Sequence, residues 1–272
     1  MITTNLTGVV ETPTMAAYPY LVGRDGAAYV PTGGAGVVLG IRLGDSVFAY
    51  DADHAAPGAT LVHPDPAARH ALTAFACLGN EAVVRTGPAA GAEGRVLGKR
   101  GELGRVITLF DQDVLATLRP DDQVLIRAVG QGAPPAEVTV LNVDPSLLPA
   151  LTDRLSVRAR VPSELVGNGI GRPAHQWDLD IQLDPDTAPR WHAEDLRIGD
   201  LLCIDDIDVR YGTGRRKGWV TVAVVVHGSS PLPGHGPGAM PILCGPADRL
   251  PVEVEPDTHV GVTAALLGLS DA

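Results

Sequence analysis

Turns rich in glycine and proline separate short valine-rich runs along the whole chain, and this pattern limits the fold more than any other feature. The 272 residues include 32 Gly and 23 Pro. Short β-branched runs between closely spaced turns are typical of all-β proteins. We therefore expect a mainly β chain of barrel- or sandwich-like units with a few short helices.

The length predicts either one large domain or two of medium size, because domains typically have about 150 residues. Two runs share one pattern, since IRLGDSVFA (41–49) and LRIGDLLCI (196–204) each place a Gly-Asp turn before alternating apolar residues. This repetition suggests two related β units. We expect an N-terminal β-rich portion over residues 1–152 and a C-terminal β-rich portion over residues 153–272.

Three local elements stand out between the turns. Residues 47–50 and 219–227 are predicted to be strands, and the continuous apolar character of the second indicates that both its faces are covered. Residues 64–76 are predicted to form a helix that the Asp65 side chain caps.

A glycine-rich hairpin is predicted at residues 81–98, where two short strands flank a Gly-Pro turn. It resembles the KOW hairpin of small SH3-like barrels, in which glycines let two sharply twisted strands turn. KOW domains often bind RNA through basic and aromatic residues, most of which are missing from this hairpin. The hairpin leaves open a non-catalytic binding or assembly module with a protein or RNA partner.

The charge and cysteine content exclude several classes of protein. The net charge is −11, and both halves are acidic, which argues against a nucleic-acid partner. The three cysteines are far apart and form no CxxC, which argues against disulfides and a cysteine zinc site. The sequence shows no signal-peptide pattern and no apolar run of about 20 residues, so we expect a cytoplasmic protein without a membrane partner.

Histidine and aspartate gather in the loops that follow predicted strands. Asp51, Asp53 and His54 form a turn suited to a metal site or to a general base with its orienting carboxylate. His227 ends the long apolar run, and His235 lies within GHGPG, where glycines allow the backbone to approach a ligand closely. The structural alternatives are a solvated turn and histidines that bond only to backbone.

Two pairs of aspartates could provide oxygen ligands. In WDLDI, strand alternation places Asp178 and Asp180 on one face, where a cation, a shared proton or solvent must separate their charges. Asp205 and Asp208 follow another apolar run and could hold a divalent cation. The alternatives are an exposed strand face for the first pair and an acidic turn neutralised by nearby arginines for the second.

Several of these segments, in order, resemble the prokaryotic family called DUF4438: GDSVFAYDADHAAPGA, FACLGNEAVV, GNGIG, WDLDI, LRIGDLLCIDDID and VVVHGSSPLPGHGPG. The resemblance runs from about residue 20 to residue 245. It implies a compact, β-rich protein with an N-terminal and a C-terminal portion. It also implies that seven of the histidines and aspartates named above belong to the family pattern: His54, Asp178, Asp180, Asp205, Asp208, His227 and His235. This chain departs from that pattern at Ala52, where Gly is usual, and at Leu179, where Tyr is usual.

We predict a small-molecule enzyme whose site lies between the two β portions. The expected reaction is hydrolysis of an amide- or lactam-type bond, or an acid/base-driven cyclisation of a polar metabolite. A divalent metal such as zinc is left open as cofactor, and the lack of GxGxxG and GxxxxGK[ST] argues against a nucleotide cofactor. Exposed sheet edges leave a homo-oligomer open as well. The predicted site residues are His54, Asp180, His235 and Glu81 for catalysis, Asn80, Asn168, Asp178 and Tyr211 for substrate binding, and His227, Asp205 and Asp208 for the metal.

Overall fold

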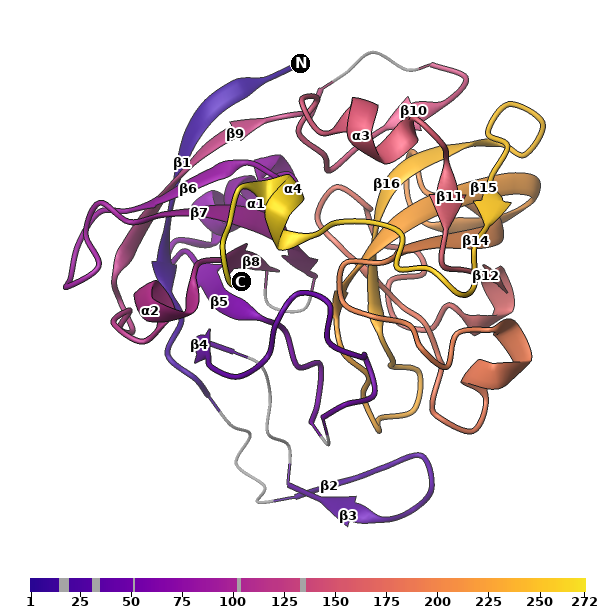
Figure 1. Ribbon diagram of the computed structural model, residues 1–272, viewed down its shortest axis with the longest axis horizontal. Helices are drawn as coiled ribbons and strands as arrows, with labels where there is room; N and C mark the ends of the chain where they lie inside the picture. The colour runs from indigo at the N-terminus through magenta and orange to yellow at the C-terminus, as the bar shows by residue number, and fades with distance from the viewer. Residues whose placement is uncertain (15–19, 31–34, 51, 102–103, 133–135) are drawn as a thin grey trace.

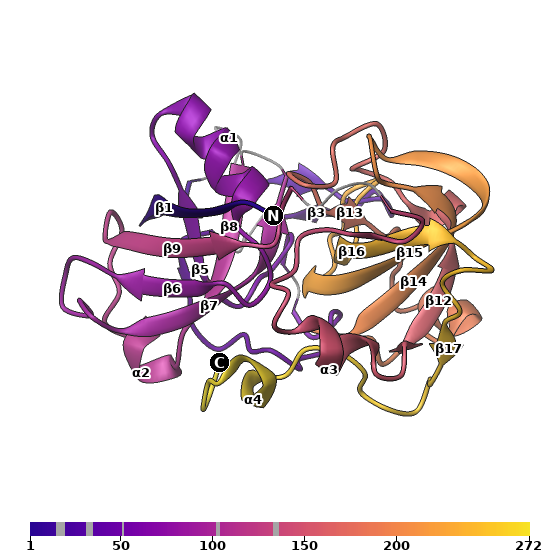
Figure 2. The ribbon, with the colours of Figure 1, turned by 90° about the horizontal axis from the view of Figure 1, so that it is seen from above.

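Two β structures lie side by side in the computed structural model, one built mainly from each half of the chain (Figures 1 and 2). The structure describes every residue except 15–19, 31–34, 51, 102–103 and 133–135. The predicted mainly β fold is confirmed. The helices of the described part are short: α1 (Pro66–Phe75), α2 (Gln112–Leu115), α3 (Leu148–Thr152) and α4 (Ala264–Leu267).

The N-terminal structure is a closed six-stranded barrel. Its strands follow the order β1–β9–β6–β7–β8–β5, and the barrel closes because β5 also pairs with β1. Short strand β4 extends the sheet beside β5. Valine, leucine, isoleucine and alanine side chains fill the interior, as the scarcity of aromatic residues requires. The strands are β1 (Thr3–Val10), β4 (Val37–Val38), β5 (Gly58–Val62), β6 (Glu81–Val84), β7 (Glu93–Arg100), β8 (Arg105–Leu109) and β9 (Gln123–Val129).

The predicted glycine-rich hairpin is formed by β6 and β7. One of its glycines also sets the distance between the two β structures, because a Cβ at Gly98 would lie only 2.5 Å from Val226 Cγ1. The absence of a side chain therefore lets β7 pack directly on the second sheet, and it brings the C-terminal end of β7 close to that sheet.

The second sheet has the strand order β10–β16–β15–β14–β12, and β13 pairs with β16 away from this path. The long apolar run predicted as a strand is the buried part of β15. β10 joins this sheet although it precedes residue 152. The strands are β10 (Thr139–Val140), β12 (Ala159–Pro162), β13 (Leu179–Asp180), β14 (Leu201–Asp208), β15 (Gly214–His227) and β16 (Gly238–Pro246).

Smaller elements complete the fold. α1 begins as predicted, because the Asp65 side chain accepts a hydrogen bond from Ala68 N and Pro66 occupies the first turn. The C-terminal segment, drawn in yellow, returns to the barrel beside α4, where Gln112 N donates to Asp271 O (Figure 1). Two two-stranded pairs remain, β2 (Leu21–Val22) with β3 (Ala28–Tyr29) and β11 (Ser156–Val157) with β17 (Glu253–Val254). No helix of the described part has the length and apolar character needed to cross a membrane.

The strand predicted at residues 47–50 is wrong, because this segment folds as a series of turns. Ala49 N donates to Ser46 O, and Tyr50 Oη donates to Asp45 Oδ2 at 2.6 Å. These local hydrogen bonds take the place of bonds to a neighbouring strand. The segment therefore bends toward the second sheet instead of continuing the barrel.

The two repeated Gly-Asp turns do share one geometry. Asp45 Oδ2 accepts from Arg42 N at 2.8 Å, and Asp200 Oδ2 accepts from Arg197 N at 2.7 Å. The turns also bond to each other, since Ile198 N donates to Asp45 O. This pairing joins the two halves and anchors the segment that leads to His54.

Candidate functional site

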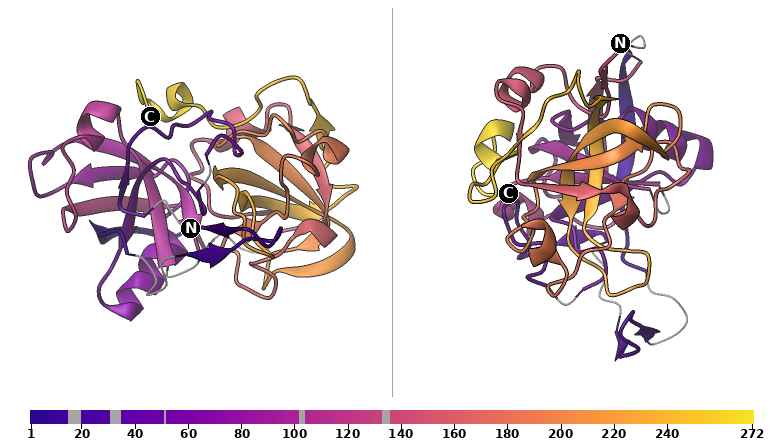
Figure 3. Two further views of the ribbon diagram at one scale, coloured as in Figure 1. Left: turned by 90° about the horizontal axis from the view of Figure 1, so that it is seen from below. Right: turned by 90° about the vertical axis from the view of Figure 1, so that its right-hand side faces the viewer.

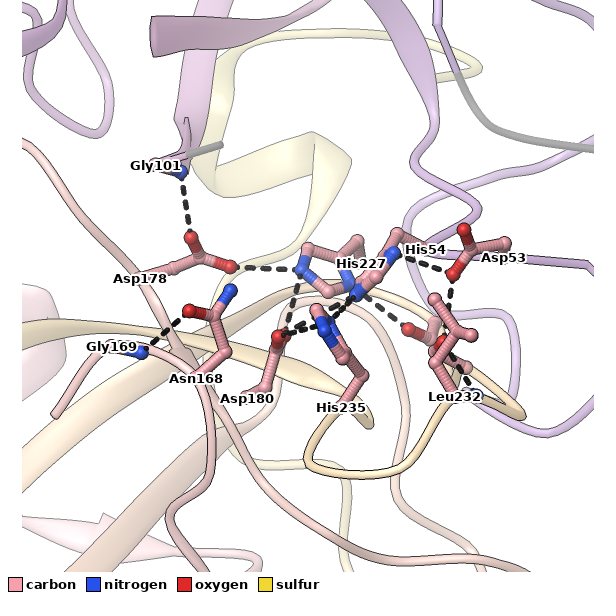
Figure 4. A network of polar contacts seen from close by, with 12 residues as sticks. Asp53, His54, Gly101, Asn168, Gly169, Asp178, Asp180, His227, Leu232 and His235 are labelled. Atoms are coloured by element: carbon pink, nitrogen blue, oxygen red, sulfur yellow. Dashed lines mark hydrogen bonds and ion pairs between the residues drawn. The ribbon is translucent and has the colours of Figure 1, made fainter. Parts of the chain in front are cut away.

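Three histidines and two aspartates from distant parts of the chain meet in a buried cluster between the two β structures (Figure 4). His54 follows the turns of the N-terminal half, and the other four residues come from the second sheet and its loops. We call this set the His/Asp cluster: His54, Asp178, Asp180, His227 and His235. The predicted carboxylate at Asp51 lies outside the described residues.

The two aspartates lie at the start of strand β13, with Asp180 inside the strand and Asp178 directly before it. The strand pairs antiparallel with β16, and the alternation of its extended backbone turns Asp178 and Asp180 to the cluster while Leu179 enters the core with no exposed surface. Both carboxylates are buried, with 6% and 3% of their residues' surface exposed. The alternative of an exposed strand face is therefore wrong.

His227 reaches the cluster at an irregularity in the sheet. The register between β15 and β16 shifts between Val225 and His227, and such bulges redirect side chains near functional sites. Opposite it, a Cβ at Gly238 would lie 2.0 Å from His227 Nε2. Only glycine at this position leaves room for the imidazole ring.

His235 is held by a tightly packed loop. A Cβ at Gly236 would lie 1.8 Å from Ile181 O, so the glycine lets this loop rest on the backbone beside β13. On the other side, the Arg24 guanidinium donates to Ser230 O at 2.8 Å and to His235 O at 3.0 Å. The glycines of GHGPG thus permit close contact with the protein itself, and this contact fixes the position of His235.

His54 has a left-handed backbone conformation, with φ of 54°. This conformation is uncommon for residues other than glycine and occurs often at functional sites, where the surrounding structure enforces it. Here His54 N donates to Ser229 O, in the loop that follows β15. The turn therefore aims the imidazole at the second sheet.

The hydrogen bonds of His227 leave its second nitrogen facing oxygen acceptors. Its Nδ1 lies 2.8 Å from Gly228 O, and because a carbonyl only accepts, Nδ1 must carry a proton. Its Nε2 lies 2.8 Å from Asp178 Oδ2 and 3.6 Å from Asp180 Oδ1. A neutral ring would direct its Nε2 lone pair at two carboxylates, so a proton or a metal cation is required there.

His54 is arranged in the same way. Its Nδ1 lies 2.6 Å from Asp53 Oδ1, which also accepts from Ser230 Oγ at 2.7 Å. Its Nε2 faces Asp180 Oδ2 at 3.5 Å and His235 Nδ1 at 3.0 Å. A carboxylate that orients one histidine nitrogen while the other faces a cation is common around protein-bound metals.

The electrostatics of the cluster favour charged forms despite burial. Burial alone would lower the pKa of His54, but its contacts with Asp180 and Asp53 raise that pKa to about 9. Burial would raise the pKa of Asp53, yet contacts with His54 and Ser230 hold that pKa at about 2. The pKa of Asp180 also lies well below its usual range, because His235 and His54 outweigh the effect of burial. Asp53 and Asp180 are therefore ionised, and their charges can compensate a cation.

A small cavity of about 10 Å³ opens within the cluster. This volume matches about one water-sized particle, such as a single water or ion. Three residues line it together with four members of the cluster: Arg100, Gly101 and Asn168. Gly101 N also donates to Asp178 Oδ1 at 2.9 Å, so the end of β7 fixes the free oxygen of that carboxylate.

The remaining predicted site residues lie outside the cluster and have partners of their own. Asp205 forms a bidentate pair with Arg160, and Asp208 pairs with Arg210 and Arg216. Arginines therefore neutralise both carboxylates, as the alternative expected, although the two residues lie in strand β14 and not in a turn.

Glu81, Asn80 and Tyr211 are also elsewhere. Glu81 pairs with Arg127 at 3.2 Å, and the buried Asn80 side chain bonds to Val129 backbone atoms. Tyr211 is 79% exposed. Of the residues predicted to bind substrate, Asn168 and Asp178 are the ones that line the small cavity.

Sequence reasoning missed Arg100, Gly101 and Ser230. Arg100 ends β7, whose local pattern indicates only a hairpin, and Gly101 follows it directly. Ser230 lies in a loop of ordinary turn residues. The proximity of Ser230 to Asp53, 177 positions away, could have been found only from the tertiary fold.

Comparisons with known proteins agree with this architecture. The crystal structure of TM1086 is similar to this chain, with a TM-score of 0.86 and 30% sequence identity, over 96% of this chain and 94% of that one. No curated protein matches the sequence. The profile of the DUF4438 N-terminal domain, described as a domain of unknown function, matches residues 20–149, and the profile of its C-terminal domain matches residues 152–263. The chain therefore belongs to the DUF4438 family.

Proposed function

We propose that the His/Asp cluster is the divalent metal centre of a hydrolase that acts on an amide- or lactam-type bond of a small polar metabolite. One observation carries the proposal: the Nε2 atoms of His54 and His227 both point at acceptors while their Nδ1 atoms are engaged elsewhere. Imidazole and carboxylate donors in a buried setting are typical of zinc and related ions.

The spacing of the donors supports a metal. His54 Nε2, His235 Nδ1 and Asp180 Oδ2 are 3.0, 2.9 and 3.5 Å apart. Ligand atoms of a tetrahedral zinc ion lie roughly 3.3 Å from one another, given metal–ligand distances near 2.0 Å. Small shifts of these side chains would therefore suffice to complete the coordination.

A bound ion would polarise the substrate carbonyl and make the attacking water more acidic. Residues of the chain hold the metal ligands in position. Asp53 orients His54, and Gly101 N orients Asp178, so the inner ligands keep their direction. Arg100 and Asn168 line the same small cavity, so their side chains lie close to the proposed ion.

A neighbouring cavity has the size for a small substrate. It measures about 260 Å³ and shares Gly101 with the small cavity of the cluster. Arg69, Thr73, Gln176 and Trp177 contribute to its lining, which combines polar groups with one aromatic face. This composition suits a small metabolite that carries amide or carboxylate groups.

Metal content provides the test of this proposal. Protein purified without chelator is expected to contain a divalent metal, and His54→Gln is expected to bind zinc at the site that His54 ligates more than about 100-fold more weakly, because even outer-sphere changes cost 10–100-fold. Elemental analysis and zinc titration measure both quantities. His192→Gln is the matched control, since His192 is exposed and lines neither the cavity of the cluster nor the neighbouring one. Metal-free wild-type protein that takes up no zinc, manganese or cobalt would refute the proposal.

The catalytic part needs its own experiment. Zinc-loaded protein is expected to hydrolyse members of a panel of small amides and lactams, with His235→Gln reducing kcat strongly and His192→Gln leaving it unchanged. Release of carboxylate and amine can be followed by mass spectrometry. A metal-loaded protein that is inactive across the panel would argue for a metal-binding protein without this reaction.

A second prediction concerns the outer contacts of His54. Ser230→Ala removes the hydroxyl that donates to Asp53 Oδ1 at 2.7 Å, and Asp53 then loses one of its two anchors. We expect zinc affinity to fall by about 10-fold while the free energy of unfolding changes little. Competition with a chromophoric chelator measures the affinity, and Ser229→Ala, one residue earlier, is the control. Equal loss in the two variants would contradict a specific role for Ser230.

A further inference from the structure

Asp180 is the centre of the His/Asp cluster, and its two oxygens face different partners (Figure 4). Oδ2 lies 2.9 Å from His235 Nδ1 and 3.5 Å from His54 Nε2. Oδ1 lies 3.6 Å from His227 Nε2. One carboxylate therefore serves two groups of ligands at once.

The five donors divide into two sets of three that have only Asp180 in common. The first set is His54, Asp180 and His235, and the second is Asp178, Asp180 and His227. Within each set, all donor atoms lie within 4.8 Å of one another. The first set offers two imidazole nitrogens and one carboxylate, and the second offers one imidazole nitrogen and two carboxylates. Each set can therefore provide three protein ligands and leave one position of the ion open.

Each set also has its own orienting contacts. Asp53 fixes His54 in the first set. In the second, Gly228 O fixes His227 and Gly101 N fixes Asp178, so that His227 Nε2 and Asp178 Oδ2 come 2.8 Å apart. If a single ion bound to the first set alone, the orienting contacts of the second set would have no role in metal binding.

We propose that the centre is dinuclear, with Asp180 bridging two divalent ions. His54 and His235 complete the first ion site, and His227 and Asp178 complete the second. This inference rests on the proposed metal centre and adds a second ion to it. The small cavity has room for one particle, so the second ion requires the donors of the first set, now 2.9 to 3.5 Å apart, to move slightly outward. Carboxylates bridge ions about 3.5–4 Å apart in many two-metal hydrolases, where the pair stabilises both the attacking and the leaving oxygen.

The stoichiometry of zinc binding tests the second ion. Full-length protein stripped with chelator is titrated with zinc and desalted, and metal per chain is measured. We expect two zinc ions per chain for wild type and for His192→Gln. Asp178→Asn and His227→Gln, which alter only the second site, should retain one, and so should His235→Gln, which alters only the first. Circular dichroism shows whether each variant is folded.

Manganese binding shows whether the two ions are neighbours. Two Mn²⁺ ions bridged by Asp180 are spin-coupled, so wild-type protein with two equivalents should lose the six-line signal of isolated Mn²⁺, and Asp178→Asn with one equivalent should show it. One zinc per chain in wild type, or two uncoupled manganese ions, would overturn the dinuclear centre while leaving a metal centre in place. No metal at all would instead refute the proposed function.

Discussion

Asp180→Asn is expected to abolish metal binding and to lower hydrolysis more than any other single substitution in the cluster. The reason is geometric, because the Asp180 carboxylate is the group that contacts all three imidazoles. An asparagine keeps the shape but removes the charge, and its NH₂ group cannot ligate a cation. We expect zinc affinity and kcat/KM each to fall more than about 100-fold, beyond the range of outer-sphere changes.

Thermal unfolding gives a second measure of the same loss. A ligand that binds only the folded state raises its stability, so zinc should raise the Tm of wild-type protein and leave the Tm of Asp180→Asn unchanged. Asp186→Asn is the matched control, since it makes the same chemical change at an exposed site six residues further on. An Asp180→Asn variant that zinc stabilises as much as wild type would show that the ion binds elsewhere.

The parts of the site that follow from local patterns could be predicted from the sequence. Alternation along WDLDI predicts that Asp178 and Asp180 share a face, and both do contact His227. The glycines around His235 predict a close backbone approach, although the approach is to Ile181 O rather than to a ligand. These inferences need only the geometry of a few neighbouring residues.

The membership of the cluster could not be predicted in this way. Asp205 and Asp208 fit the pattern of oxygen ligands as well as Asp178 does, and the sequence leaves open whether they bind a cation or the nearby arginines that they contact in the structure. The meeting of His227 with Asp178 depends on the pairing of β13 with β16 and on a register shift in β15. Such contacts between distant residues are set by tertiary packing, which local sequence does not encode.

The same limit explains the error at residues 47–50. The sequence pattern there matches the entry to β14, and the two Gly-Asp turns do have equal hydrogen bonds. The segment after the first turn lacks a partner strand in the described structure and instead bonds locally and to the second turn. An alternating apolar run forms a strand only where a neighbouring strand is available to pair with it.

The second large expected effect concerns Lys99. It is an effect on the free energy of unfolding and on how that free energy depends on pH. Lys99 is fully buried at the end of β7, where Nζ donates to Asn142 Oδ1 at 2.7 Å, to His175 O at 2.6 Å and to Ala74 O at 3.4 Å. Burial lowers the pKa of Lys99 to about 8, and the nearby Cys77 opposes this shift only in part. The contact to His175 O also steadies the loop that precedes Asp178.

The direction of the pH effect follows from this lowered pKa. Below pH 8 both the folded and the unfolded chain hold the proton, and the folded protein bears the full cost of a buried charge. Between pH 8 and the ordinary lysine pKa of 10.5, the unfolded chain keeps the proton that the folded protein has released. The contribution of Lys99 to the free energy of unfolding therefore rises with pH, by on the order of 3 kcal/mol over the whole window.

Lys99→Met removes this titration, so urea unfolding at several values between pH 7 and pH 10 can isolate it. The free energy of unfolding of wild type relative to Lys99→Met is expected to increase steadily above pH 8. Lys217→Met, at the chain's other lysine, is exposed on β15 and should track wild type at every pH. If the difference between wild type and Lys99→Met stays constant from pH 7 to pH 10, the lysine titrates in the folded protein as it does in water. The oxygen acceptors at Asn142 and His175 would then stabilise the ammonium enough to cancel the cost of its burial.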